Sequence, residues 1–192
     1  MRLGTKFFEM PTVDLAKALL GKLLVYGELS GKIVETEAYL FRGDPACHAS
    51  RGRTRRNEPM FARAGNVYVY LIYGMHVCLN VVSGAVGEGE AVLIRAVEPV
   101  SGLDAMRERR GTDMAEDLCR GPGRLTRAFG ITVEHNNSSL IDGRIEIHDK
   151  GEKPAILSSP RIGIKEGSEL ELRFFVAGSR FVSGGKRARV AG

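Results

Sequence analysis

Two glutamates and a tyrosine stand close together in the segment GKIVETEAYL, which spans residues 31–40. The segment is rich in β-branched residues and begins at a Ser-Gly turn signal, so it predicts a β-strand. Because side chains alternate across a strand, Glu35, Glu37 and Tyr39 are expected on one face. The two expected faces are Ile33, Glu35, Glu37 and Tyr39, and Val34, Thr36, Ala38 and Leu40. The second face suits a hydrophobic core, whereas the first brings two carboxylates and a phenol together.

Cleavage of a glycosidic bond is one chemistry that paired carboxylates perform. Side chains at i and i+2 on one strand face stand about 6.5–7 Å apart, which lies between the separations of retaining and inverting glycosidases. A sugar hydrolase is therefore one alternative, although the chain has no tryptophan to form a flat platform for a sugar. Glu35 equally suits a surface strand position or a salt bridge to an arginine, and we expect it to be structural.

Basic residues gather in the segment that follows this strand. The six arginines between Phe41 and Arg63 are opposed only by Asp44 and Glu58. A solvated basic loop would explain them, and so would a surface that contacts phosphates, since the arginine fork matches phosphate oxygens. A sugar hydrolase gives no reason for this cluster. The candidate phosphate contacts are Arg51, Arg53, Arg55 and Arg56.

Tyrosines are concentrated in a predicted β-hairpin over residues 67–80, which turns at the sequence YGMH. Tyr68 and Tyr70 share one face of its first strand, and Tyr68 is expected to be an ordinary strand residue with a solvated hydroxyl. Tyr73 stands at the turn itself, where a side chain can wedge into a base step of DNA. An enzyme that acts on a base must take it out of the stack and hold it against aromatic surfaces. Aromatic and basic features therefore favour a nucleic-acid ligand.

Several other classes of function find little support in the sequence. The four histidines show no i, i+4 pairing and no C-x-x-C occurs, so His48 beside Cys47 is only a weak metal signal. Neither G-x-S-x-G nor a Walker A motif is present. Three scattered cysteines argue against a disulfide framework and for a reducing cytoplasm. We expect no signal peptide and no membrane-spanning segment.

The remaining patterns predict an α+β fold in one domain over residues 1–192, with a mostly antiparallel sheet, short helices and a protruding hairpin. The predicted strands are 22–27, 32–40, 66–72, 77–84, 90–99, 144–149 and 171–178. Thr12 is expected to cap a helix that ends at Gly21, and Ser101 a helix that ends at Gly111. Pro122 suits the first position of a helix that ends at Gly130. Residues 184–192 are expected to form a mobile basic tail.

Several of these motifs occur together and in order from about residue 3 to Ser183. They are VETEAY at 34–39, His48, RN-x-PMF at 56–61, VYVYLIYGM at 67–75, CLN at 78–80, VLIRAVEP at 92–99 and GPGRL at 121–125. As an ordered set they resemble the alkyladenine (3-methyladenine) DNA glycosylase family. The resemblance implies a single mixed domain with a strongly bent antiparallel sheet. It also implies a monofunctional hydrolase that removes damaged purines from duplex DNA and leaves an abasic site.

The resemblance also implies roles for individual residues. Glu37 matches the general base, Arg95 a residue that places the attacking water, and Ile162 the position whose backbone carbonyl holds that water. The base pocket matches Tyr39, His48, Tyr70, Cys78, Asn80 and Leu93. Tyr73 matches the intercalating residue, with Met75 beside it. Asn80 matches a residue that would exclude guanine by a clash with its 2-amino group. The alternative is that Asn80 only stabilises the hairpin backbone. The position of His76 is often aromatic in the family, so the resemblance assigns His76 no role.

The implied substrates are 3-methyladenine, 7-methylguanine, hypoxanthine and similar purines, with no metal or organic cofactor. A methylated purine carries a positive charge, which the π-faces of Tyr39 and Tyr70 would hold. The implied partner is double-stranded DNA that contains damaged purines. We expect the protein to act as a monomer. Its expected location is the cytoplasm, at the nucleoid in a bacterium or archaeon, or the nucleus in a eukaryote. We expect no lyase step, because the sequence places no lysine or N-terminal amine in the pocket. A DNA-binding module that has lost turnover remains the second alternative.

Overall fold

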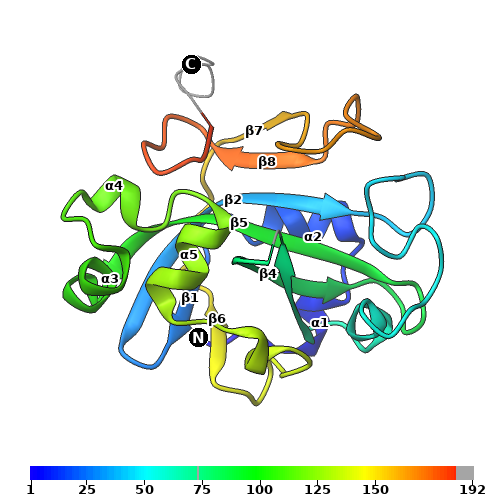
Figure 1. The fold of residues 1–192 in the computed structure, drawn as a ribbon, viewed down its shortest axis with the longest axis horizontal. Coiled ribbons are helices and arrows are strands. Elements are labelled where there is room, and N and C mark those ends of the chain that lie inside the picture. Colours follow the sequence, from blue (N-terminus) through cyan, green and yellow to red (C-terminus); the bar gives the residue numbers. More distant parts are fainter. Residues whose placement is uncertain (73, 185–192) are drawn as a thin grey trace.

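A computed structural model describes residues 1–72 and 74–184 of the chain. Within them a curled antiparallel sheet of eight strands carries short helices on its flanks (Figure 1). The strands are β1 (Leu23–Tyr26), β2 (Leu29–Tyr39), β3 (Val67–Ile72), β4 (His76–Ser83), β5 (Glu90–Ser101), β6 (Ile145–His148), β7 (Ile156–Ser159) and β8 (Arg173–Val176). The α-helices are α1 (Thr5–Phe8), α2 (Thr12–Ala18), α3 (Leu103–Arg110), α4 (Ala115–Leu118) and α5 (Pro122–Phe129). Two 3₁₀ turns, η1 (Glu58–Phe61) and η2 (Val133–His135), complete the set. The predicted α+β class with a bent antiparallel sheet is therefore confirmed.

Strand β2 is the centre of the sheet, whose order is β3-β4-β5-β2-β1-β6. One edge of β2 pairs with β5 over its whole length. The other edge is shared, because β1 pairs with the first part of β2 and β8 pairs with Glu35, Thr36 and Glu37. The two carboxylates therefore lie in the part of β2 that has β5 on one side and β8 on the other.

A double irregularity interrupts the pairing of β2 with β5. Ile33 pairs with Val97, Glu35 with Ala96 and Thr36 with Ile94. Val34 on β2 and Arg95 on β5 are therefore extra residues in the ladder. Bulges of this kind re-aim side chains. This one turns Arg95 toward the carboxylates of β2, with which it forms salt bridges.

The same irregularity makes one part of the predicted alternation wrong. Ile33 was expected on the face of Glu37, yet it packs in the main hydrophobic core together with Ala38. Thr36 also faces the helical layer, since its hydroxyl donates to the backbone oxygen of Ala16 in α2. Simple alternation holds only for the segment after the bulge, where Glu37 and Tyr39 share a face opposite Thr36 and Ala38.

The predicted helices occur, although two of the predicted caps are wrong. Pro11 rather than Thr12 precedes α2, and the Thr12 hydroxyl instead shares a 2.9 Å hydrogen bond with Ser83. Gly102 rather than Ser101 precedes α3, because the Ser101 hydroxyl donates to the backbone oxygen of Glu28. Helix α5 begins at Pro122 and ends before Gly130, as the sequence predicts. The sequence reading missed α1, α4, β7 and both 3₁₀ turns.

Two hydrophobic clusters lie on the two sides of the sheet. The main core packs α2 and α5 against the sheet, through residues such as Leu15, Leu125 and Phe129. A smaller cluster joins the 41–61 segment to β3–β5 and includes Tyr68. Tyr68 is a strand residue as expected, but it is only 1% exposed, and its hydroxyl lies 3.0 Å from Nδ1 of His48 and is not solvated. Tyr39 and Tyr70 pack on this smaller cluster and are thereby held at its edge.

Two predictions concern residues that lie partly or wholly outside the part of the chain that the structure describes. Tyr73, the predicted wedge, lies outside the described residues, as do 185–192 of the predicted tail. Among the helices that are described, none combines the length and the apolar character needed to cross a bilayer.

Candidate active site

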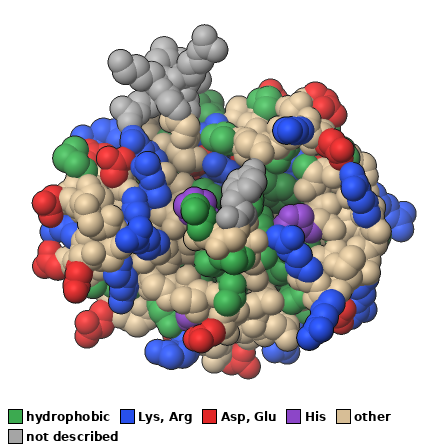
Figure 2. Space-filling view, viewed as in Figure 1, with side chains coloured by type: hydrophobic (Ala, Val, Ile, Leu, Met, Phe, Trp, Pro, Cys, Tyr) green, Lys and Arg blue, Asp and Glu red, His purple; other side chains and the backbone are tan. Residues whose placement is uncertain are grey.

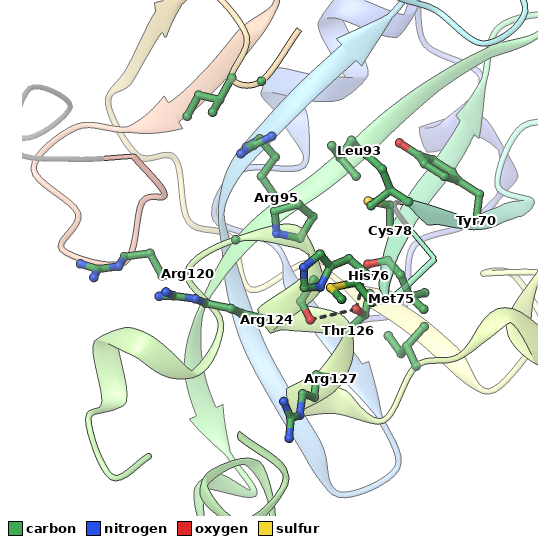
Figure 3. A pocket seen from close by; sticks show the side chains of 18 of the residues that line it. Tyr70, Met75, His76, Cys78, Leu93, Arg95, Arg120, Arg124, Thr126 and Arg127 are labelled. Atoms are coloured by element: carbon green, nitrogen blue, oxygen red, sulfur yellow. Dashed lines mark hydrogen bonds between the residues drawn. The ribbon is translucent and has the colours of Figure 1, made fainter. Parts of the chain in front are cut away.

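A cavity of about 750 Å³ opens between the hairpin β3–β4, strand β5, the start of α5 and the 162–164 segment. Figure 3 shows Arg95 and Leu93 near its centre, Tyr70 and Cys78 on one side, and Arg120, Arg124 and Arg127 on the other. One wall is thus aromatic and apolar, and the opposite wall is cationic. The predicted site residues that line it are Tyr39, His48, Tyr70, Met75, Cys78, Leu93, Arg95 and Ile162.

Glu37 lies directly behind the cavity surface. Its side chain is fully buried, and three cavity-lining residues donate hydrogen bonds to its carboxylate. Oε1 accepts from the backbone N–H of Ile162 at 2.9 Å, and Oε2 accepts from the Tyr39 hydroxyl at 2.9 Å and from Arg95 at 3.2 Å. A carboxylate has about four acceptor sites, so one remains for a further donor. The structure thus brings Glu37, Arg95 and Ile162 together.

Glu35 has a different environment. Its carboxylate accepts from Arg95 at 3.2 Å, from Arg173 at 2.6 Å, and from both the backbone N–H and the hydroxyl of Ser183. It is fully buried, so the surface alternative is wrong and the salt-bridge alternative is confirmed. With its oxygens engaged in this way, Glu35 is not free to serve as a second catalytic carboxylate. The geometry therefore disfavours the sugar hydrolase.

Arg95 links the two carboxylates. Its guanidinium donates to Glu35, Glu37 and the Ser183 hydroxyl, at 3.2–3.3 Å. Arg173 completes the group by donating to the backbone oxygen of Ser183 at 3.0 Å. Two nearly buried arginines thus balance two fully buried carboxylates, which is the condition under which buried charges are tolerated.

Three aromatic rings form the apolar wall. The rings of His48 and Tyr70 meet edge to face with centroids 4.6 Å apart, and Nδ1 of His48 lies 3.0 Å from the Tyr68 hydroxyl. Burial lowers the pKa of His48, with a smaller contribution from the charge of Arg56, so the ring is neutral at pH 7. Burial raises the pKa of Tyr39 well above its usual value, and the charge of Glu37 adds to this effect. Both groups therefore keep their neutral forms beside the cavity.

Asn80 lies at the inner end of this wall. It lines a small extension of about 20 Å³ that shares Tyr39, His48 and Tyr70 with the main cavity. Its side-chain N–H donates to the backbone oxygen of Tyr68 at 3.0 Å. The structure thus shows the tie to the hairpin backbone.

Comparison with known proteins agrees with this arrangement. A model of the family "Methylpurine-DNA glycosylase (MPG)" matches residues 6–180. The chain belongs to the methylpurine-DNA glycosylase family. A protein of Methanoculleus marisnigri is 52% identical over 95% of this chain and 99% of its own length. Proteins of Chlorobium phaeobacteroides and Chlorobaculum tepidum are 48% and 47% identical, over 98% and 95% of this chain and 98% and 90% of their own lengths. All three are named "Putative 3-methyladenine DNA glycosylase".

These findings confirm the resemblance and the association with DNA repair. In this glycosylase-family chain the described residues include no group of three or more His, Cys, Asp and Glu side chains that could hold a metal ion.

A cationic patch that the sequence reading missed borders the cavity. It consists of Arg110, Arg120, Arg124 and Arg127, all of which line the cavity. Figure 2 shows Lys and Arg side chains beside the central hollow, on the side where α3 and α5 lie. Burial lowers the pKa of Arg110, and the charges of Arg124 and Arg127 lower it further. The three-residue spacing of Arg124 and Arg127 on one helix face was the available signal.

The predicted phosphate contacts are placed differently. None of Arg51, Arg53, Arg55 and Arg56 is among the residues that line the cavity. Arg51 and Arg53 pair with Glu166 and Glu58. Arg56 donates to the backbone oxygen of Leu71 at 3.0 Å and lies over the Tyr70 ring, so it supports the aromatic wall from outside.

The hairpin tip packs against the start of α5. Met75 is 72% exposed and lines the cavity. A Cβ at Gly123 would lie 3.1 Å from the His76 ring, so a larger residue there would require the ring to shift slightly. Thr126 donates to the backbone oxygen of Val77 at 2.9 Å and ties α5 to the base of the hairpin. The position of the tip therefore depends on α5.

Proposed function

We propose that this protein releases damaged purines from duplex DNA by hydrolysing the N-glycosidic bond, with Glu37 as the general base. The observation that carries the proposal is the position of Glu37, which is buried one hydrogen bond behind a cavity with aromatic walls. A water beside the free acceptor site of Glu37 would lose its proton to the carboxylate while attacking the sugar. The negative charge would also stabilise the positive charge that develops on the deoxyribose.

The extruded base would lie against Tyr39, Tyr70 and His48. Neutral aromatic walls hold a methylated, cationic purine without repelling it. Arg95 would orient the water by fixing Glu37, and the backbone of Ile162 would complete the position. A lyase step is not proposed, because none of the described residues that line the cavity is a lysine.

The DNA backbone would cross the cationic patch formed by Arg110, Arg120, Arg124 and Arg127. Of these, Arg120 and Arg124 share a single carboxylate, Asp117, so the patch keeps an excess of positive charge. Phosphates supply the matching charge and make the affinity depend on salt. The protein is proposed to act on DNA as a monomer in the cytoplasm.

Removing a charge from this patch should weaken binding to every duplex alike. Arg124→Gln and Arg127→Gln are each expected to reduce the salt slope of log K by about 1, with no change in the preference for a lesion. Fluorescence anisotropy between 50 and 200 mM salt measures the slope. Arg55→Gln tests the loop arginines, and Arg144→Gln is the remote control. A reduced slope for Arg55→Gln alone would show that the loop, and not the patch, contacts phosphates.

Asn80→Ser should let guanine into the inner end of the cavity. Adenine and hypoxanthine lack the exocyclic 2-amino group that would clash with Asn80, whereas guanine has it. We therefore expect the variant to gain release of undamaged guanine and largely to keep release of hypoxanthine. The lost hydrogen bond to Tyr68 should cost about 1–3 kcal/mol of stability, visible in a thermal melt. An equal fall in the release of guanine and of hypoxanthine would show that Asn80 serves only to hold the hairpin backbone.

One assay separates this function from the alternatives. The protein is incubated with a duplex that carries one hypoxanthine, and the products are then treated with alkali. Strand scission at the lesion supports the glycosylase. Binding without scission supports a DNA-binding module that has lost turnover. The absence of both binding and scission leaves the sugar hydrolase as the remaining alternative.

A further inference from the structure

Arg161 lies directly behind one of the proposed base-binding rings. Its guanidinium carbon is 4.6 Å from the centroid of Tyr39, its side chain is fully buried, and it is not among the residues that line the cavity. Tyr39 lines the cavity and Arg161 does not, so the Tyr39 ring is the group through which this cation would act on a base in the cavity.

Few partners hold this guanidinium. Both terminal nitrogens donate to Asp44 at 2.6 Å, and one of them also donates to the backbone oxygen of Ala38 at 2.9 Å. Nε has no hydrogen-bond partner among the described residues, and it is the one buried side-chain polar atom there of which this is true. An unsatisfied buried donor is unfavourable, so the placement of this cation against the ring calls for an explanation.

Asp44 is itself fixed at the turn that follows β2. Its carboxylate accepts from the backbone N–H groups of Leu40 and Ala46, at 3.1 Å each. Arg161 thereby joins three parts of the cavity, which are the end of β2, the loop before His48 and its own neighbour Ile162. The guanidinium cannot move away from Tyr39 without breaking these links.

The charge on the hidden side of Tyr39 should affect bases on the open side. A cation over one face of an aromatic ring polarises its π-electrons toward itself. The cation–π attraction between the opposite face and a second cation is therefore weaker. Two like charges separated by one ring also repel each other. Both effects oppose a methylated, cationic purine and leave a neutral purine almost unaffected. The charge already acts on Tyr39, because burial raises the pKa of the hydroxyl whereas Arg161 lowers it.

We propose that Arg161 is a positioning residue that shifts the choice of base from cationic alkylated purines toward neutral purines, by holding a positive charge against the rear face of Tyr39. This inference rests on the proposed function, because it requires Tyr39 to face the extruded base.

The test compares single-turnover release of 7-methylguanine and of hypoxanthine from matched duplexes. Arg161→Lys can keep an ion pair with Asp44 while removing the planar cation from the ring, and Arg161→Gln removes the charge. The ratio of the 7-methylguanine rate to the hypoxanthine rate should rise about two- to fivefold in Arg161→Lys, and at least as much in Arg161→Gln. A loss of folded protein lowers both rates by the same factor and leaves the ratio unchanged.

A second stacked arginine provides the matched control. The guanidinium of Arg144 lies 5.6 Å from the ring centroid of Tyr26, and neither residue lines the cavity. Arg144→Lys should leave both rates and their ratio unchanged. An unchanged ratio in both Arg161 variants, or no detectable release of either base by them, overturns the inference. If the unaltered protein releases neither base, the proposed function fails instead.

Discussion

Glu37→Gln should abolish release of the base while DNA binding persists. The amide has almost the same shape as the carboxylate, yet it cannot take a proton from water. We expect the single-turnover rate to fall by a factor of about 10²–10⁴, the usual contribution of a general base. Alkali-treated products from a hypoxanthine duplex measure the rate, and anisotropy measures the affinity for the same duplex.

The control for this variant must lie outside the buried charge network. Glu134→Gln removes a carboxylate that is exposed in η2, and it should leave the rate unchanged. A thermal melt of Glu37→Gln confirms that the variant is folded, since Glu37 also pairs with Arg95. A folded Glu37→Gln variant that still turns over like the unaltered protein would contradict the assignment of the base.

Glu35→Gln should have the largest effect on stability. The substitution leaves Arg173 buried without its carboxylate and deprives Arg95 of one of its two. Breaking a buried ion pair by removing one partner costs about 3–5 kcal/mol, and we expect a loss of that size in the free energy of unfolding by urea.

Two further variants test the reason for this loss. Glu169→Gln removes an exposed carboxylate and should not move the urea midpoint. Arg173→Met breaks the same ion pair from the other side and should destabilise the protein to a similar degree. A midpoint for Glu35→Gln that equals that of the unaltered protein would show that the network contributes no net stability.

The sequence predicted those parts of the site that depend on local patterns. Alternation along β2 places Glu37 and Tyr39 on one face, and the hairpin pattern brings Tyr70 and Cys78 to the same wall. Turn and cap residues marked the start of α5 at Pro122 and the end of α3 at Gly111. Each of these signals operates within a few residues.

The parts that the sequence did not reveal depend on pairing between distant segments. A bulge is defined by the register of two strands, so the extra positions of Val34 and Arg95 cannot be read from either strand alone. Ile33 was therefore assigned to the wrong face. Two partners of Glu35, Arg173 and Ser183, likewise come from a segment more than a hundred residues away, as does Arg161, which packs on Tyr39.

The wide separation in sequence between the two glutamates and their hydrogen-bond partners has a consequence for co-translational folding. Arg173 and Ser183 follow Glu35 by 138 and 148 positions, and Ile162 follows Glu37 by 125. When β2 emerges from the ribosome, the partners of its two carboxylates that lie late in the sequence have therefore not yet been synthesised. Burying them before their arginines arrive would be strongly unfavourable, so this half of β2 should stay open until β8 pairs with it. A partly translated chain would thus lack a formed active site, and we expect catalytic activity to appear only when the fold is complete.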